Sequence, residues 1–281
     1  MCEPKQNTAM QYSKYSEKAN SIWKANLAFL QHLHGYHSGY INSEDFMPLS
    51  ITCSNLDLQS GKSSDGTTVF ITPFPIKKLH TILDKQQVFT TRQLSNTLDG
   101  WNIYDALEVT YLIQHYMCFS NDLDYSGLIY EESTWQTRGI DWEGGERLIQ
   151  QNEGSEWRVE FIFDKMDSNT PHVSPVLIDN SPMHKDKLSI AEICCILLCT
   201  ARRLRHREYR RHRVIPITVI SISGRLARVI HGYVDVSTNN LRIIKSPILD
   251  LNKEDTTYIM ELLVSWCLGQ PIGSTEWDNL D

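Results

Sequence analysis

The stretches WRVEFIFD, residues 157–164, and SPVLID, residues 174–179, decide the expected fold. In the first stretch, apolar residues from Trp157 to Phe163 occupy every second position, which is typical of a strand with one buried face. The second stretch is a short, nearly continuous apolar run, which is typical of a central strand covered on both faces. We therefore expect two neighbouring strands here.

The sequence after these strands predicts one long helix, three further strands and a final helix. Ser189 stands where a helix cap is expected, and apolar residues recur behind it at helical spacing until about His212. The strands are expected over 215–223, 227–236 and 241–245, and the final helix over about 253–268. The predicted order is β-β-α-β-β-β-α, an α+β fold with a mixed β-sheet core around a long central helix.

The rest of the chain predicts a helical N-terminal layer on the same domain. We expect a disordered tail over residues 1–15 and a single globular domain over 16–281. Within it, residues 16–120 are expected to form a mostly helical layer and residues 127–268 the sheet-containing core. No Pro-rich, Gly-rich or low-complexity linker divides the chain.

Composition limits the classes of function. The formal net charge of −7 disfavours general nucleic-acid binding, because phosphate contacts need clustered cations. Seven cysteines without a CxxC pair predict reduced thiols in an intracellular, cytoplasmic protein and no zinc or redox centre. The N-terminus lacks the apolar core of a signal peptide, and no apolar run is long enough to span a bilayer, so we expect no membrane association. The sequence does not predict an oligomeric state.

Three acidic residues mark the two neighbouring strands. Glu160 and Asp164 lie on the first strand, and Asp179 ends the second. With the following helix and strand, this arrangement over residues 157–250 resembles the core of the PD-(D/E)XK nuclease-like superfamily. The resemblance implies that Glu160 or Asp164 would pair with Asp179 to hold Mg²⁺, beside a lysine that orients the attacking water. Ser181 occupies the position of that lysine, so a divergent metal-dependent nuclease or nucleic-acid binder is an alternative function here.

The C-terminal half also resembles a family of proteins common in filamentous fungi, a similarity that implies no particular activity. The chain has no Gly-x-Ser-x-Gly elbow, no Gly-x-Gly-x-x-Gly loop and no Walker loop. These absences disfavour serine-nucleophile catalysis and dehydrogenase, kinase and P-loop functions. We expect no cofactor, with Mg²⁺ required only by the nuclease alternative.

Aromatic residues gather in the predicted sheet region and suggest a pocket for an apolar small molecule. With a few polar groups, such a pocket would suit a small-molecule-binding protein, for example a cofactor-independent cyclase or isomerase of fungal secondary metabolism. The same residues also fit an ordinary hydrophobic core. The candidate catalytic residues of this hypothesis are His231 and Tyr233, and its candidate ligand-binding residues are Trp135, Trp142, Trp157, Phe161 and Phe163.

Seven arginines lie between Arg202 and Arg213. They could bind phosphate groups, or they could form a solvated helix end that complements the helix dipole. A third function is therefore a non-catalytic interaction module that uses this arginine-rich segment or the acidic residues 122–167 to dock a partner protein.

Overall fold

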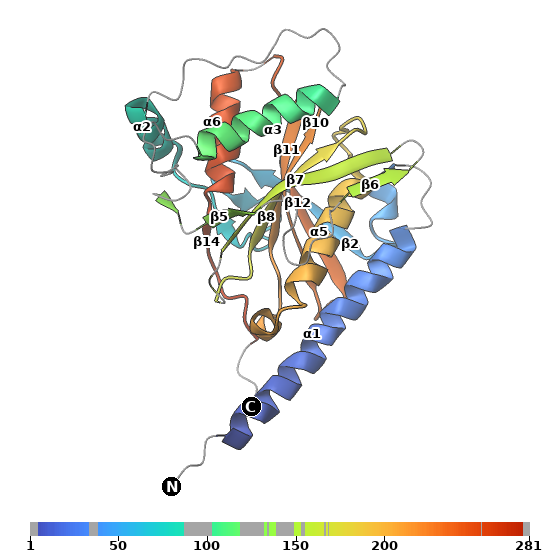
Figure 1. Cartoon of the computed structure of the whole chain (residues 1–281). Coiled ribbons are helices and arrows are strands. Elements are labelled where there is room, and N and C mark those ends of the chain that lie inside the picture. Colours follow the sequence, from blue (N-terminus) through green and yellow to red (C-terminus); the bar gives the residue numbers. More distant parts are fainter. Residues whose placement is uncertain are drawn as a thin grey trace.

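The computed structural model describes residues 5–33, 39–86, 103–118, 132–133, 135–138, 149–152, 155–165, 167, 169–253 and 255–277. Across these ranges, a mixed sheet lies between helices on its two faces (Figure 1), which confirms the α+β class. The helices are α1 Lys5–Leu33, α2 Ile76–Gln86, α3 Ile103–Cys118, α5 Ile190–Arg203 and α6 Thr256–Cys267, with short 3-10 helices η1 at Ser43–Asp45 and η3 at Arg207–Arg211.

The central sheet runs in the order β3-β2-β12-β11-β10-β8-β7-β5, and β6 and β13 pair with β7 and β11. Strands β10 and β8 are parallel, as are β12 and β2, and the other pairs are antiparallel. The bounds are β2 Ile51–Asp57, β3 Lys62–Ser63, β5 Trp135–Arg138, β6 Ile149–Asn152, β7 Ser155–Lys165, β8 Val173–Asp179, β10 Ile217–Ser223, β11 Leu226–Asp235, β12 Asn240–Lys245 and β13 Leu249–Asp250.

Two small ribbons stand beside the main sheet. Strand β1, Tyr40–Asn42, pairs with β9, Lys187–Ser189, immediately before α5. Strand β4, Ile71–Thr72, pairs with β14, Gln270–Pro271, immediately after α6. The main elements β7, β8, α5, β10, β11, β12 and α6 follow the predicted β-β-α-β-β-β-α order.

The N-terminal part differs from the predicted helical layer. Helix α1 begins at Lys5, so residues 5–15 are helical rather than a disordered tail. Strand β2 pairs in parallel with β12, so the first 120 residues also contribute strands to the main sheet. Their helices separate: α1 packs on α5, whereas α2 and α3 pack on α6. Short-range patterns could not reveal this pairing because β2 and β12 lie far apart in the sequence.

Helix α5 packs its apolar stripe on one face of the sheet, together with α1 (Figure 1). It begins at a capping box, in which the Ser189 side chain accepts the Glu192 N–H and the Glu192 side chain accepts the Ser189 N–H. The helix ends at Arg203 rather than near His212. Beyond it, the Arg210 guanidinium donates to the carbonyls of Leu204 and Arg205, which the ending helix leaves unpaired.

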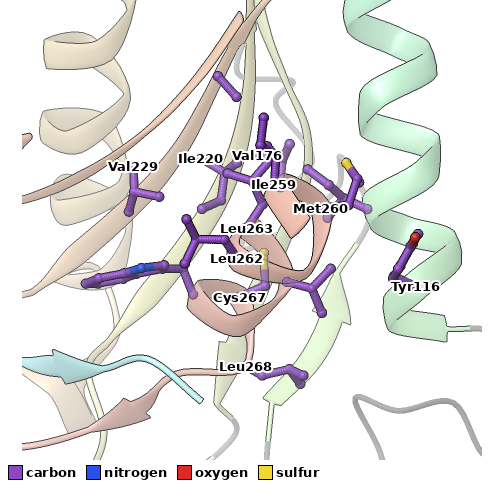
Figure 2. Packing of buried hydrophobic residues seen from close by; sticks show 14 of the residues in the cluster. Tyr116, Val176, Ile220, Val229, Ile259, Met260, Leu262, Leu263, Cys267 and Leu268 are labelled. Carbon is purple, nitrogen blue, oxygen red and sulfur yellow. The ribbon is translucent and has the colours of Figure 1, made fainter. Parts of the chain in front are cut away.

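Helices α2, α3 and α6 cover the opposite face. Figure 2 shows side chains of α6, among them Leu263 and Cys267, packed between strand residues such as Val176 and Ile220 and the Tyr116 side of α3. The N-cap of α6 is Asp255, whose carboxylate accepts the N–H groups of Thr257 and Tyr258. The sheet therefore separates two hydrophobic cores.

A β-bulge in β7 changes the predicted alternation. The register with β8 shifts between Val159 and Phe161, which leaves Glu160 as the extra residue. Trp157 and Val159 consequently belong to the α5-side core, whereas Phe161 and Phe163 belong to the α6-side core. The strict alternation inferred from the sequence had placed all four on one face.

None of the helices in the described ranges is long and apolar enough to cross a membrane.

Candidate functional site

A small polar pocket opens at the carboxyl ends of the parallel strands β8 and β10. Ligand sites commonly form there in open α/β sheets, because the chain leaves the sheet edge in loops. The pocket encloses about 190 Å³ of space, part of it open to solvent. Its water-accessible interior is close to the size of a single water molecule. Its lining residues are Tyr40, Asp179, Ser181, Pro182, Met183, His184, Ser189, Glu192, Ser221, Ser223 and Arg228.

Asp179, the last residue of β8, lines the pocket with a carboxyl group whose pKa is shifted. Asp179 is only 3% exposed, and its carboxylate accepts the Ser181 N–H at 2.9 Å. Burial raises the pKa of Asp179 above its ordinary value, and the negative charge of Glu192 adds to the increase. Hydrogen bonds from Ser189 and Ser181 oppose the shift without cancelling it. The carboxyl group is thus easier to protonate than an exposed aspartate.

Glu192 and Arg228 form a fully buried ion pair behind Asp179. Arg228 Nε lies 2.7 Å from Glu192 Oε1, and Arg228 Nη2 donates to Glu192 Oε2. Both side chains are 2% exposed. The pair is bidentate, so it fixes the first turn of α5 to the middle of β11 and neutralises the charge of Glu192.

The loop after β8, residues 181–187, is held through its backbone carbonyls. Tyr40 Oη donates to the Pro182 carbonyl at 2.6 Å, and Ser223 Oγ donates to the Ser181 carbonyl at 2.7 Å. Arg228 Nη1 reaches the carbonyls of His184 and Lys187, and Lys245 Nζ donates to that of Lys185. Side chains from four strands thus fix one rim of the pocket.

Tyr40 forms a wall of the pocket. The edge of the His184 ring faces the Tyr40 ring at a centroid distance of 4.8 Å. Burial, followed by the charge of Asp179, raises the pKa of Tyr40 to about 12. The phenol therefore stays protonated at ordinary pH and can keep its hydrogen bond to Pro182.

Of the three predicted strand acids, only Asp179 lies in the pocket. Asp164 sits near the other end of β7, opposite Val173, and pairs with the buried Arg203 at 3.2 Å. Glu160 lies in the bulge, where it pairs with Arg158 at 2.9 Å. The acid whose charge acts on Asp179 is instead Glu192.

The predicted aromatic residues lie in the two cores rather than around the polar pocket. Trp135, Phe161 and Phe163 pack in the α6-side core, and Trp157 packs across the sheet in the α5-side core. Trp135 Nε1 donates to the Gly269 carbonyl at 2.7 Å, so its polar group is satisfied. Trp142 lies outside the described residues.

His231 and Tyr233 meet Phe70 on the sheet face opposite Arg228. His231 Nε2 accepts the Phe70 N–H at 3.2 Å, and its Nδ1 lies 3.0 Å from Thr218 Oγ1. The Tyr233 ring contacts Phe70 edge-on at 5.1 Å. His172 also binds the Phe70 carbonyl through Nε2, at 2.8 Å. These contacts anchor the segment before β4 to the sheet and leave His231 with both ring nitrogens engaged.

The arginine-rich segment is used in several different ways. Arg203 is buried and donates to the carbonyls of Pro171 and His172 as well as to Asp164. Arg210 caps the end of α5, and Arg211 pairs with Glu276 at 3.2 Å. Of the seven arginines in this segment, only Arg205 and Arg207 are exposed. The segment therefore does not present its cations as one continuous face.

The ranges that the structure describes hold no group of three or more His, Cys, Asp or Glu side chains placed to bind a metal ion. Glu192 is the acid whose charge raises the pKa of Asp179. Both of its carboxylate oxygens accept hydrogen bonds from Arg228.

Sequence reasoning missed Tyr40, His184, Glu192 and Arg228 as site residues. One signal was present: Ser189 followed three residues later by Glu192 is a capping-box pattern, which places both at the start of α5. The contact between Glu192 and Arg228 joins positions 36 apart in the chain and has no sequence signature.

Comparison of the chain with protein-family models, with curated proteins and with solved structures finds no match. We therefore infer function from the residues of the site alone.

Proposed function

We propose that this protein binds a small molecule that inserts a polar group into the pocket beside Asp179. The observation that carries the proposal is the buried Asp179 carboxyl, which lines a partly enclosed, hydroxyl-rich pocket at the carboxyl ends of β8 and β10. The interior accommodates little more than one oxygen-containing group. The inserted group is therefore a hydroxyl or carbonyl, and the rest of the ligand stays at the mouth.

The lining includes several hydroxyl groups that can bind a polar group. Ser181, Ser189, Ser221 and Ser223 contribute hydroxyl groups to the lining. Those of Ser189 and Ser223 already donate to Asp179 and to the Ser181 carbonyl, so toward a ligand they act as acceptors. This differs from the apolar ligand expected from the aromatic content, because the aromatic residues of the described sheet pack in its cores.

The same carboxyl supports a catalytic form of this proposal. Burial raises the pKa of the Asp179 carboxyl, which moves it toward the range in which a general acid serves a cofactor-independent isomerase or cyclase. In this form Asp179 carries the proton, and the Ser189 hydroxyl and Ser181 N–H orient it. The link to fungal secondary metabolism stays a prediction from the sequence.

The test is a ligand-observed NMR screen with small neutral alcohols, aldehydes, ketones and amides. Fragments that bind wild type are expected to lose at least about tenfold in affinity to Asp179→Leu, which keeps a similar volume but removes both carboxyl oxygens. Tyr40→Phe should also weaken binding, because it releases the Pro182 carbonyl at the rim.

Tyr111→Phe is the matched control for Tyr40→Phe, since Tyr111 lies exposed on α3 on the other side of the sheet. It should bind every fragment as wild type does. If no fragment binds wild type, or if Asp179→Leu binds them equally well, the pocket is not a ligand site and the proposal is wrong.

A divergent metal-dependent nuclease is the second candidate. It is favoured by one observation: the predicted acid Asp179 does end the strand that leads into α5, and a second acid, Glu192, lies close enough to raise its pKa. Titration of Mg²⁺ and Mn²⁺ into wild type and Asp179→Ala, with a plasmid-nicking assay on the same samples, separates the candidates. Metal binding and nicking that are both lost in the variant would select the nuclease, and their absence from wild type would exclude it.

A further inference from the structure

We propose that the ligand of the Asp179 pocket is an anion, a small hydroxy or oxo compound whose carboxylate or phosphate group is held at the mouth by Lys187 and His184. This inference rests on the proposed small-molecule function and specifies its substrate class. It stands on the placement of charged side chains around the opening.

Two basic side chains near the mouth come from the rim loop. His184 lines the pocket, and the Lys187 ammonium group lies 5.8 Å from the centre of the Tyr40 ring, which forms the pocket wall. The loop carbonyls turn toward Arg228, Lys245, Tyr40 and Ser223. These contacts fix the main chain of the loop, so the Cα positions of His184 and Lys187 are held near the opening.

Of the two acids inside the pocket, one is paired with a cation. Glu192 is neutralised by its bidentate contact with Arg228. Asp179 lies deeper, only 3% exposed, and its carboxylate accepts the Ser181 N–H. The first turn of α5 adds the positive end of a 14-residue helix to the same wall. An anion at the mouth therefore meets the Lys187 ammonium group and the N-terminal end of α5 on the same wall.

The size of the pocket fixes how such a ligand lies. The interior takes about one water-sized group, so a carboxylate or phosphate cannot enter beside Asp179. The hydroxyl or carbonyl oxygen enters, and the anionic group stays at the rim, where solvent partly screens it. Binding should consequently weaken as salt is added.

Four probes that share a diol test this arrangement: glycerol, glycerate, glycerol 3-phosphate and 3-amino-1,2-propanediol. Their dissociation constants are measured by ligand-observed NMR at low and high salt. At low salt we expect at least one of the two anions to bind about tenfold more tightly than glycerol and the amine to bind more weakly. The stronger of glycerate and glycerol 3-phosphate identifies the anionic group.

Lys187→Met should remove most of the preference for the anion. The substitution keeps the Lys187 carbonyl that Arg228 binds, so the loop stays anchored. Lys185→Met is the matched control, because it changes the net charge by the same amount on the same loop, whereas it is the Lys187 ammonium group that lies over the Tyr40 ring. It should change anion binding by no more than about threefold.

The outcomes of these experiments separate the anion assignment from the proposed small-molecule function on which it rests. If glycerol binds in an Asp179-dependent way but the anions bind no better, or if Lys187→Met and Lys185→Met have equal effects, the anion assignment is overturned and small-molecule binding stands. If none of the four probes binds and the neutral fragments also fail, the proposed function itself is wrong.

Discussion

Arg228 on β11 and Glu192 in the first turn of α5 bind each other through two parallel contacts, with both side chains 2% exposed. A buried ion pair contributes little net stability against an apolar replacement of both partners. Removing one partner is costly, because the other charge stays buried alone. The pair therefore serves mainly to fix α5 and the rim loop to the sheet.

Arg228→Met is expected to lower the free energy of unfolding by about 3–5 kcal/mol. The double variant Arg228→Met with Glu192→Gln should recover part of that loss. Urea denaturation followed by circular dichroism measures both. Arg158→Met is the control, because its partner Glu160 is partly exposed and the pair should contribute no more than about 1 kcal/mol. Equal losses in the two single arginine variants would contradict the role of the buried pair.

Acidification should destabilise the protein through its buried histidines. Burial lowers the pKa of His172 and of His231 to about 3, from an ordinary value of 6.5. The native state thus requires both rings neutral, so their contribution is complete above pH 6.5 and falls as pH decreases toward 3. The slope should reach about 1.4 kcal/mol per pH unit for each histidine.

Urea denaturation at several pH values between 7 and 4 measures this slope. The variant His231→Gln removes one of the two groups, so its stability should fall less steeply with acidification than that of wild type. Identical slopes in His231→Gln and wild type would show that His231 does not stay neutral in the fold.

Gly232 lets α5 approach β11. A Cβ atom at this position would lie 2.6 Å from Ile196 Cδ1. We expect Gly232→Ala to cost about 1–3 kcal/mol of stability through overpacking. Ile196→Val, which removes Cδ1, should reduce that cost, and a double-mutant cycle from thermal or urea unfolding measures the coupling.

Gly39→Ala is the control, since its Cβ would meet only Ser181 Oγ, at the ordinary distance of 3.5 Å. Its effect should stay within about 0.5 kcal/mol. Strict additivity of Gly232→Ala and Ile196→Val would argue against the close approach of β11 and α5.

The bulge at Glu160 predicts an unequal tolerance to deletion. Removing Glu160 leaves Val159 and Phe161 as direct neighbours with their faces unchanged, so the protein should fold with a loss of about 2 kcal/mol or less. Removing Ile162 instead reverses the faces of Phe163 and Asp164 and should prevent folding. Circular dichroism and thermal unfolding compare the two deletions. Equal behaviour would contradict the bulge position.

Several predictions from the sequence hold because local patterns carry them. The β-β-α-β-β-β-α order follows from alternation in strands and helical spacing in α5 and α6, and Ser189 was recognisable as the start of α5. Helix α5 ends at Arg203, earlier than its residue pattern predicts, and Arg210 folds back to bind the carbonyls of Leu204 and Arg205 just beyond it. The sequence shows that an arginine stands at position 210 but not where its side chain points.

The candidate site was predictable at one residue. Asp179 ends a recognisable strand, so its place at a sheet edge followed from the sequence. Asp164 and Glu160 are also acidic residues, and both lie on the strand that precedes that of Asp179. Pairing with Arg203 and the bulge in β7 place them elsewhere. No local pattern distinguishes an acid in a pocket from an acid in an ion pair.

By itself, the sequence determined the secondary structure of the core and the position of the α5 cap, because these depend on sterics and polarity within a few residues. Tertiary structure alone decided that β2 pairs with β12, that Phe161 and Trp157 face opposite cores, and that Tyr40, Glu192 and Arg228 meet at Asp179. These contacts depend on strand register and on the crossover between β8 and β10, which bring distant segments together.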